Sequence, residues 1–181
     1  MSERGPLLIL GLGNILCADD GLGVVAVHEL ERRYVAPAGA EVLDGGTLGL
    51  SLLPHVQDAG AVILVDAART GDPPGSFVRL EGDDVGPAVR ERLSPHQIGV
   101  EDLLQGARLL DSYPRKLVLL GLVPESIELR LGLSPALASR LDGLIESIVS
   151  EVRRLGCVFR PRGCHEADTR FTVDAVGALG L

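Results

Sequence analysis

Acidic and imidazole side chains follow several apolar stretches of this 181-residue chain in a way that suits metal binding. Asp20 follows the first apolar run, Asp66 closes the run at 61–65, and His96 lies in a proline-containing loop before a helical pattern. Two carboxylates and one imidazole suit a divalent first-row metal and leave positions for water or substrate. The sequence therefore predicts a metal site at Asp20, Asp66 and His96, if the fold brings them to one edge.

A strand, a tight loop and a helix must position Asp20. Leu7–Leu10 is continuously apolar, as expected of a strand covered on both faces, and Asp19 and Asp20 end the loop that follows it. Apolar residues then recur at helical spacing to about Tyr34. Because ligands of open α/β sheets bind outside the carboxyl ends of the strands, this loop is where a site is expected.

Strands and helices alternate through the rest of the chain. Further strands are predicted at 41–44, closed by Asp44, at 61–65, at 76–81 with one wet face, and at 116–123. Helices are predicted at 48–58, with Thr47 as cap, at 100–110, and as one continuous helix from Ser134 to Leu155. The order predicts an α/β fold: a three-layer sandwich around a mostly parallel sheet. We expect one domain over 1–159 and a tail of uncertain order over 160–181.

Composition limits the classes of function. Hydrophobic residues make up 46% of the chain and aromatic residues 3%, which indicates an aliphatic core. The formal net charge of −8 disfavours general binding to nucleic acid or to an anionic membrane. Three cysteines and no signal peptide or membrane span favour a reducing, cytoplasmic location.

Single residues of these motifs also have ordinary structural explanations. An aspartate at a strand end often caps a turn, and we expect Asp19 to hold its loop rather than to bind metal. Cys17 is interpreted as a small apolar residue of the loop, although a role as a soft ligand or nucleophile stays open. The glycines at 11 and 13 do not complete a dinucleotide fingerprint, because position 16 is Leu.

Taken together, five motifs resemble the nickel–iron hydrogenase maturation endopeptidases. The likeness runs in register from about Leu7 to Leu155. The motifs, in chain order, are GLGNILCADDGLG, LDGGT, LVDA, SPHQIG and LGLVPES. The resemblance implies a twisted, mainly parallel sheet of about five strands. It also implies an activity, the removal of a short C-terminal peptide from a hydrogenase large-subunit precursor after nickel insertion.

The resemblance assigns a role to the three predicted metal ligands, and the position of Asp44 beside Gly45 and Gly46 suggests roles for the residues around it. Asp20, Asp66 and His96 would bind the nickel that the precursor carries, so the divalent metal is supplied by the substrate. Asp44 is expected to act in catalysis, as a base or by orienting the peptide. The substrate peptide is expected to contact a further group of residues: Gly45, Gly46, Thr47 and Gln97.

Two other functions fit part of the pattern. A metal-binding maturation chaperone without peptidase activity would use the same ligands. A peptidyl-tRNA hydrolase-like enzyme would share the GLGN opening, but such enzymes rely on a histidine soon after it, and this chain has Asp19 and Asp20 there.

Overall fold

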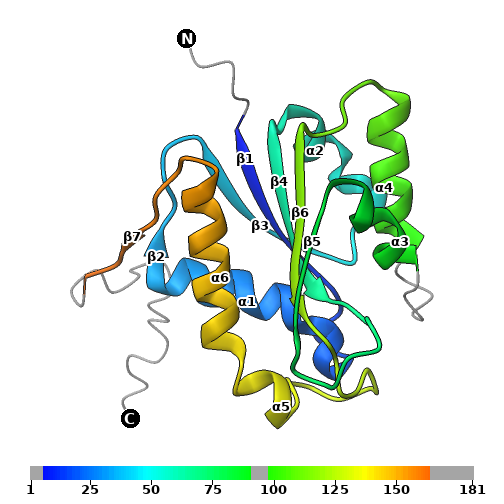
Figure 1. Cartoon of the computed structure of the whole chain (residues 1–181), viewed down its shortest axis with the longest axis vertical. Coiled ribbons are helices and arrows are strands. Elements are labelled where there is room, and N and C mark those ends of the chain that lie inside the picture. The colour runs from blue at the N-terminus through cyan, green and yellow to red at the C-terminus, as the bar shows by residue number, and fades with distance from the viewer. Residues whose placement is uncertain (1–5, 91–97, 164–181) are drawn as a thin grey trace, which may run out of the picture.

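A five-stranded sheet lies between two layers of helices in the computed structural model, which describes residues 6–90 and 98–163 (Figure 1). Across the sheet the strands follow the order β3 (Ala40–Gly46), β1 (Leu7–Leu12), β4 (Ala61–Ala67), β6 (Lys116–Leu122) and β5 (Phe77–Glu81). The first four are parallel, and β5 pairs antiparallel with β6 at one edge. The predicted three-layer α/β sandwich is therefore confirmed.

Each face of the sheet has its own aliphatic core. One face carries α1 (Leu22–Arg33), α5 (Pro135–Ala138) and α6 (Leu141–Arg154). The other carries η2 (Gly49–Leu52), α2 (Leu53–Asp58), η3 (Gly82–Asp84), α3 (Val85–Arg90) and α4 (Ile98–Leu109). The central strands are buried on both sides, which explains why their sequences are continuously apolar rather than alternating.

The chain leaves neighbouring strands β1 and β4 in opposite directions. From β1 it passes through α1 on one face to β3, whereas from β4 it reaches β6 by way of β5, α3 and α4 on the other face. The carboxyl ends of β1 and β4 therefore form a topological switch point, where open α/β sheets leave a crevice for ligands.

The predicted last helix is broken in two. Ser134 caps α5 as expected, because its Oγ accepts the backbone N–H of Leu137. The expectation of one continuous helix is wrong, since α5 ends at Ala138 and α6 begins at Leu141. Ser139 Oγ donates to the carbonyl of Ala136 at 3.0 Å, a local bond that competes with helix continuation.

The beginning of the predicted tail is attached to the domain. Arg160–Pro161 forms β7, which pairs antiparallel with β2 (Tyr34–Val35) directly after α1. The backbone N–H of Arg162 donates to the carbonyl of Arg33 at 2.8 Å. The rest of the tail, residues 164–181, lies outside the described residues.

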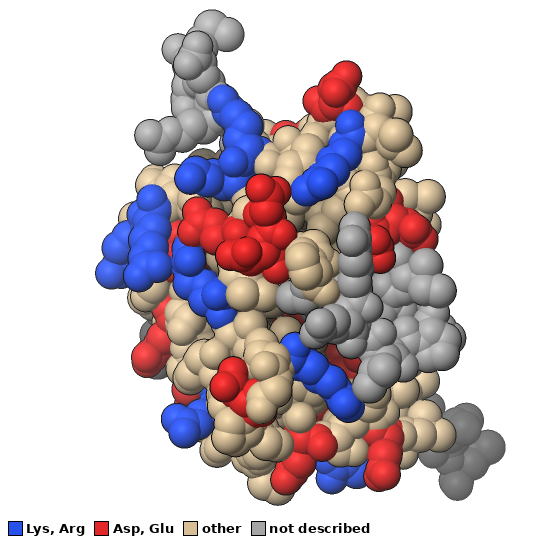
Figure 2. Space-filling model, turned by 45° about the vertical axis from the view of Figure 1, so that its right-hand side comes forward, with Lys and Arg blue, Asp and Glu red and all other residues tan. Residues whose placement is uncertain are grey.

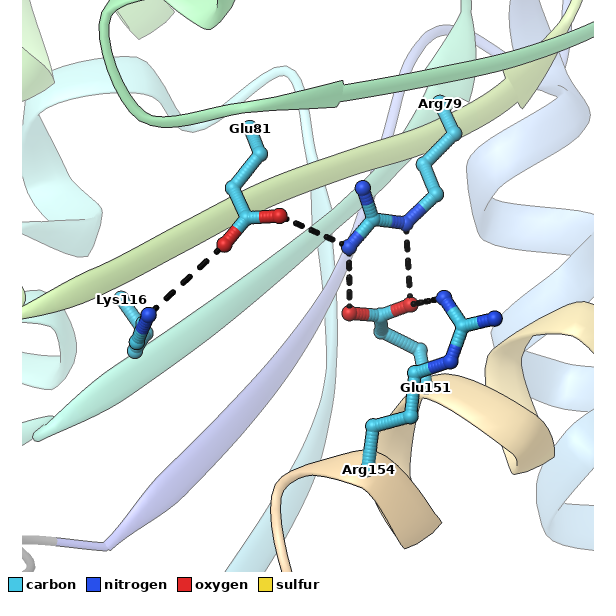
Figure 3. Close-up of polar contacts among 5 residues, drawn as sticks. All are labelled: Arg79, Glu81, Lys116, Glu151 and Arg154. Carbon is cyan, nitrogen blue, oxygen red and sulfur yellow. Dashed lines mark hydrogen bonds and ion pairs between the residues drawn. The ribbon is translucent and has the colours of Figure 1, made fainter.

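An ion-pair network fastens the edge strand β5 to α6 (Figure 3). The Arg79 guanidinium on β5 donates to both oxygens of Glu151 on α6, at 3.0 and 2.8 Å. Arg79 also donates to Glu81, and Glu151 also accepts a hydrogen bond from Arg154. Glu151 is almost fully buried, so this pair holds the antiparallel edge against the helical layer.

The surface carries mixed charge. Acidic and basic side chains alternate over the face that Figure 2 shows, without a continuous basic stripe on that face. Within the described residues, no helix combines the length and apolar character that a membrane crossing requires.

Candidate active site

Asp20 lies in a turn that a glycine makes possible. It belongs to η1 (Ala18–Gly21), the short helix between β1 and α1, and its side chain is buried. Gly13 has φ of +119°, and a Cβ built there would lie 1.7 Å from the carbonyl oxygen of Asp20. Asn14 donates its backbone N–H to Asp20 Oδ2 at 3.0 Å. The Gly-Asn pair of the motif therefore allows the turn and orients the carboxylate.

Asp66 is the next-to-last residue of the neighbouring strand β4 and is fully buried. The turn that carries Asp20 contacts β4, and the start of α1 packs closely on the same strand. A Cβ built at Gly23 would lie 2.0 Å from the carbonyl oxygen of Val65, so only glycine permits this approach. Both carboxylates are thus carried by contacting elements at the switch point between β1 and β4.

The third predicted ligand, His96, lies outside the described residues, and so does Gln97. The chain is described again from Ile98, where α4 begins, and Gly99 lies against Gly49 of η2. Over residues 6–90 and 98–163, no group of three His, Cys, Asp or Glu side chains is arranged to hold a metal ion. The described part of the chain therefore provides the two acidic residues of the predicted triad.

Asp19 holds the loop, as the sequence predicts. Its carboxylate accepts the backbone N–H groups of Glu125 and Ser126 at Oδ2, at 2.9 and 3.1 Å, and that of Ser134 at Oδ1, at 2.6 Å. These bonds fasten the connection between β6 and α5 to the turn that carries Asp20. Asp19 thus positions its neighbour and uses both of its own oxygens within the fold.

Asp44 points to the opposite face of the sheet from Asp66. It pairs with Gly11 and lies in the same row as Val65, so its side chain lies on the α1 face, whereas Asp66 is one residue further along β4 and points to the other face. Asp44 Oδ2 lies 2.9 Å from Nε2 of His28 on α1. Sequence analysis missed this partner, because no local pattern links a helix position to a strand end.

Gly45 and Gly46 are the last residues of β3, and Thr47 begins the turn that follows the strand. The carbonyls of Gly45 and Gly46 accept backbone N–H groups from Leu48 and Gly13, at 3.0 and 2.9 Å, so both carbonyls are used within the fold. Thr47 is exposed and does not cap a helix, contrary to the prediction. The helical stretch instead starts as η2 after Leu48, without a side-chain cap.

Fold and site together define a class: a doubly wound α/β protein with buried carboxylates at the switch point of its sheet. Comparison with known proteins narrows this class. A family model described as hydrogenase maturation protease matches residues 24–151. The chain therefore belongs to the hydrogenase maturation protease family.

Individual relatives agree with this assignment. The chain is 36% identical over 157 residues to the hydrogenase 2 maturation protease of Escherichia coli, covering 86% of this chain and 96% of that protein. It is 40% identical over 153 residues to the hydrogenase expression/formation protein HupD of Rhodobacter capsulatus, covering 83% of this chain and 72% of that protein. The solved structure of the hydrogenase maturating endopeptidase HybD from Escherichia coli superposes with a TM-score of 0.83, covering 87% of this chain and 98% of that one. An endopeptidase is therefore favoured over a chaperone or a peptidyl-tRNA hydrolase.

Proposed function

We propose that this chain removes the C-terminal extension of a nickel-loaded hydrogenase large-subunit precursor, and that Asp20, Asp66 and His96 bind the nickel. Family membership supports the peptidase activity. The observation that carries the metal site is the burial of Asp20 and Asp66, 3% and 0% exposed, on contacting elements at the switch point. Placing two carboxylates in a low-dielectric edge is costly, and a cation bound between their elements offsets that cost.

The three predicted ligands suit the nickel ion that the precursor carries. Carboxylate oxygens and a neutral imidazole are accepted by divalent nickel, and a three-residue set leaves coordination positions for the precursor's own ligands. A precursor without nickel lacks this anchor, so recognition of the ion acts as a test that the metal has been inserted. Bound nickel also supplies Lewis-acid polarisation of a nearby carbonyl or water.

Residues of this chain would hold the peptide beside that ion. We propose that Gly45, Gly46 and Thr47, together with Gln97, contact the extension, and that Asp44 acts as base or orients the scissile peptide. The position of Asp44 in the last part of β3, directly before these three residues, supports contact with the peptide. Its placement on the opposite face from Asp66 makes the base role separately testable.

We also propose that processing takes place in the cytoplasm. Cys17 and Cys157 are free thiols, as expected in a reducing compartment.

The test is incubation of a purified precursor with and without nickel, followed by intact-mass measurement. We expect loss of the C-terminal extension only from the nickel-loaded form. His96→Ala is expected to abolish the mass change, and His55→Ala serves as control, because His55 pairs with Glu41 near the start of β3, at the opposite edge of the sheet from Asp20 and Asp66. Unchanged mass of the nickel-loaded precursor after incubation with folded wild-type protein would favour the chaperone, and equal processing by His96→Ala would remove the ligand role.

A further inference from the structure

Exposed apolar side chains gather at the edge of the sheet that carries the candidate active site. We name this group the apolar rim; its members are between 50% and 84% exposed. They are Ile15, Leu16, Leu48, Leu50, Leu129 and Leu131. All six lie in the connections that follow β1, β3 and β6, so they surround the carboxyl ends of three parallel strands.

The distribution of exposed apolar residues is uneven. Among the described residues, ten large hydrophobic side chains are exposed, and six of them belong to the rim. Of the others, Leu109 ends α4 and Leu110 follows it, and both precede β6, which places them at the opposite edge of the sheet. Exposed apolar groups gathered on one surface mark a site of protein interaction more often than the same groups scattered singly.

Two segments of the rim are held rigidly by the backbone. The N–H of Arg130 donates to the carbonyl of Leu16 at 2.9 Å, and the N–H of Ala18 donates to the carbonyl of Arg130 at 2.7 Å. Cys17 and Arg130 therefore form a parallel bridge. Leu129 and Leu131 lie on either side of Arg130 in the sequence, and both are exposed. The two exposed leucines therefore flank a residue that backbone hydrogen bonds fix against the loop after β1.

Asp19 connects the rim to the candidate metal site. Its carboxylate binds the backbone of the connection that carries Leu129 and Leu131, at Glu125, Ser126 and Ser134. The next residue is Asp20. The segment that carries Leu129 and Leu131 is therefore attached to the same turn that contains the predicted nickel ligand Asp20.

We propose that the apolar rim docks the folded body of the hydrogenase large-subunit precursor while its C-terminal extension enters the site. This inference rests on the proposed function. The occupant follows from covalent continuity, because a peptide that reaches the edge of the sheet is attached to a protein whose surface must lie over that edge. A precursor surface of apolar character would bury the leucines, and the buried centre of an interface contributes most of its binding free energy.

The test compares two double variants in steady-state processing of the nickel-loaded precursor. Leu129→Ser/Leu131→Ser is expected to raise KM at least about tenfold, which corresponds to the loss of two modest apolar contacts, with kcat within about twofold of wild type. The matched control Leu109→Ser/Leu110→Ser alters two exposed leucines at the opposite edge and is expected to keep the wild-type KM. Both variants should keep the wild-type thermal midpoint, because all four side chains are exposed.

Direct binding to immobilised precursor separates this inference from the proposed function. If wild type binds the precursor but does not shorten it, the peptidase proposal is overturned, and weaker binding by the Leu129→Ser/Leu131→Ser variant alone still supports the rim. Wild-type KM and affinity in that variant would overturn the docking proposal. So would sedimentation showing that the rim mutations only dissociate a complex between two copies of this chain.

Discussion

The carboxylate of Asp44 lies 2.9 Å from the imidazole of His28, on the face of the sheet that α1 covers. The same strand carries a second pair of this kind, Glu41 with His55 at 3.2 Å, near the other end of the strand. Both pairs are substantially exposed. Because the two pairs are alike, the Glu41 pair can serve as a control. It shows the small contribution of a surface ion pair to stability, from which a role of Asp44 in cleavage can be separated.

Asp44→Asn is expected to reduce the single-turnover rate of precursor cleavage by about 100-fold or more, the usual range for loss of a general base. The matched control is Glu41→Gln, which breaks the other pair and should leave the rate unchanged. Both variants should keep the wild-type free energy of unfolding within about 1 kcal/mol, as expected for exposed pairs. A wild-type rate for Asp44→Asn would rule out the base role.

Asp19 and Asp20 are adjacent acids with opposite expected phenotypes. Asp19→Asn replaces a carboxylate that accepts three backbone N–H groups, so at least one buried donor loses its acceptor. We expect a loss of about 3 kcal/mol in the free energy of unfolding, measured in urea. Asp20→Asn should unfold within about 1 kcal/mol of wild type and yet fail to process the precursor, because an amide is a poor replacement for an anionic ligand. The reverse order of stabilities would contradict these assignments.

The edge network predicts a specific dependence of stability on pH. Hydrogen bonds from Arg79 lower the pKa of Glu151 from its usual 4.5, against the effect of burial. A lowered folded-state pKa contributes stability that is complete above the unfolded pKa and is lost as the pH falls through the folded value. Wild type should therefore lose more stability than Glu151→Gln between about pH 5 and pH 3.

At neutral pH the same substitution should reduce the free energy of unfolding by about 2 kcal/mol, because Glu151 is buried and accepts two charged hydrogen bonds from Arg79 and a third from Arg154. Glu81→Gln is the control: its carboxylate also binds Arg79, but it is nearly half exposed, so its loss should cost less than about 1 kcal/mol. Equal effects of the two substitutions would show that burial does not decide the strength of this network.

Sequence patterns predicted the elements well and the connections between them less well. The apolar runs and helical spacings predicted the order of strands and helices, and the alternating run at 76–81 was recognised as an edge strand, because these signals are local. The loop-holding role of Asp19 followed from its place in a tight turn. Its acceptor role toward Ser134, 115 residues away, was not predictable, since no local rule specifies a contact at that separation.

The other features that the sequence did not predict also depend on contacts beyond the local pattern. The break between α5 and α6 at residues 139 and 140 lies inside a regular apolar stripe, and that stripe gives no sign of it. The pairing of His28 with Asp44 depends on the register of α1 against β3, and the pairing of β7 with β2 joins segments more than a hundred residues apart. The leucines at 129 and 131 lie in no predicted element, so their exposure could be known only from the three-dimensional fold.

The most direct test of the central claim is a crystal structure of the chain with Ni²⁺, in which anomalous scattering at the nickel edge locates the ion. The account predicts one principal nickel peak beyond the ends of β1 and β4, bonded to carboxylate oxygens of Asp20 and Asp66 and to a ring nitrogen of His96. A principal peak bonded elsewhere on the chain, with Asp20 and Asp66 directed to separate surfaces, would contradict it.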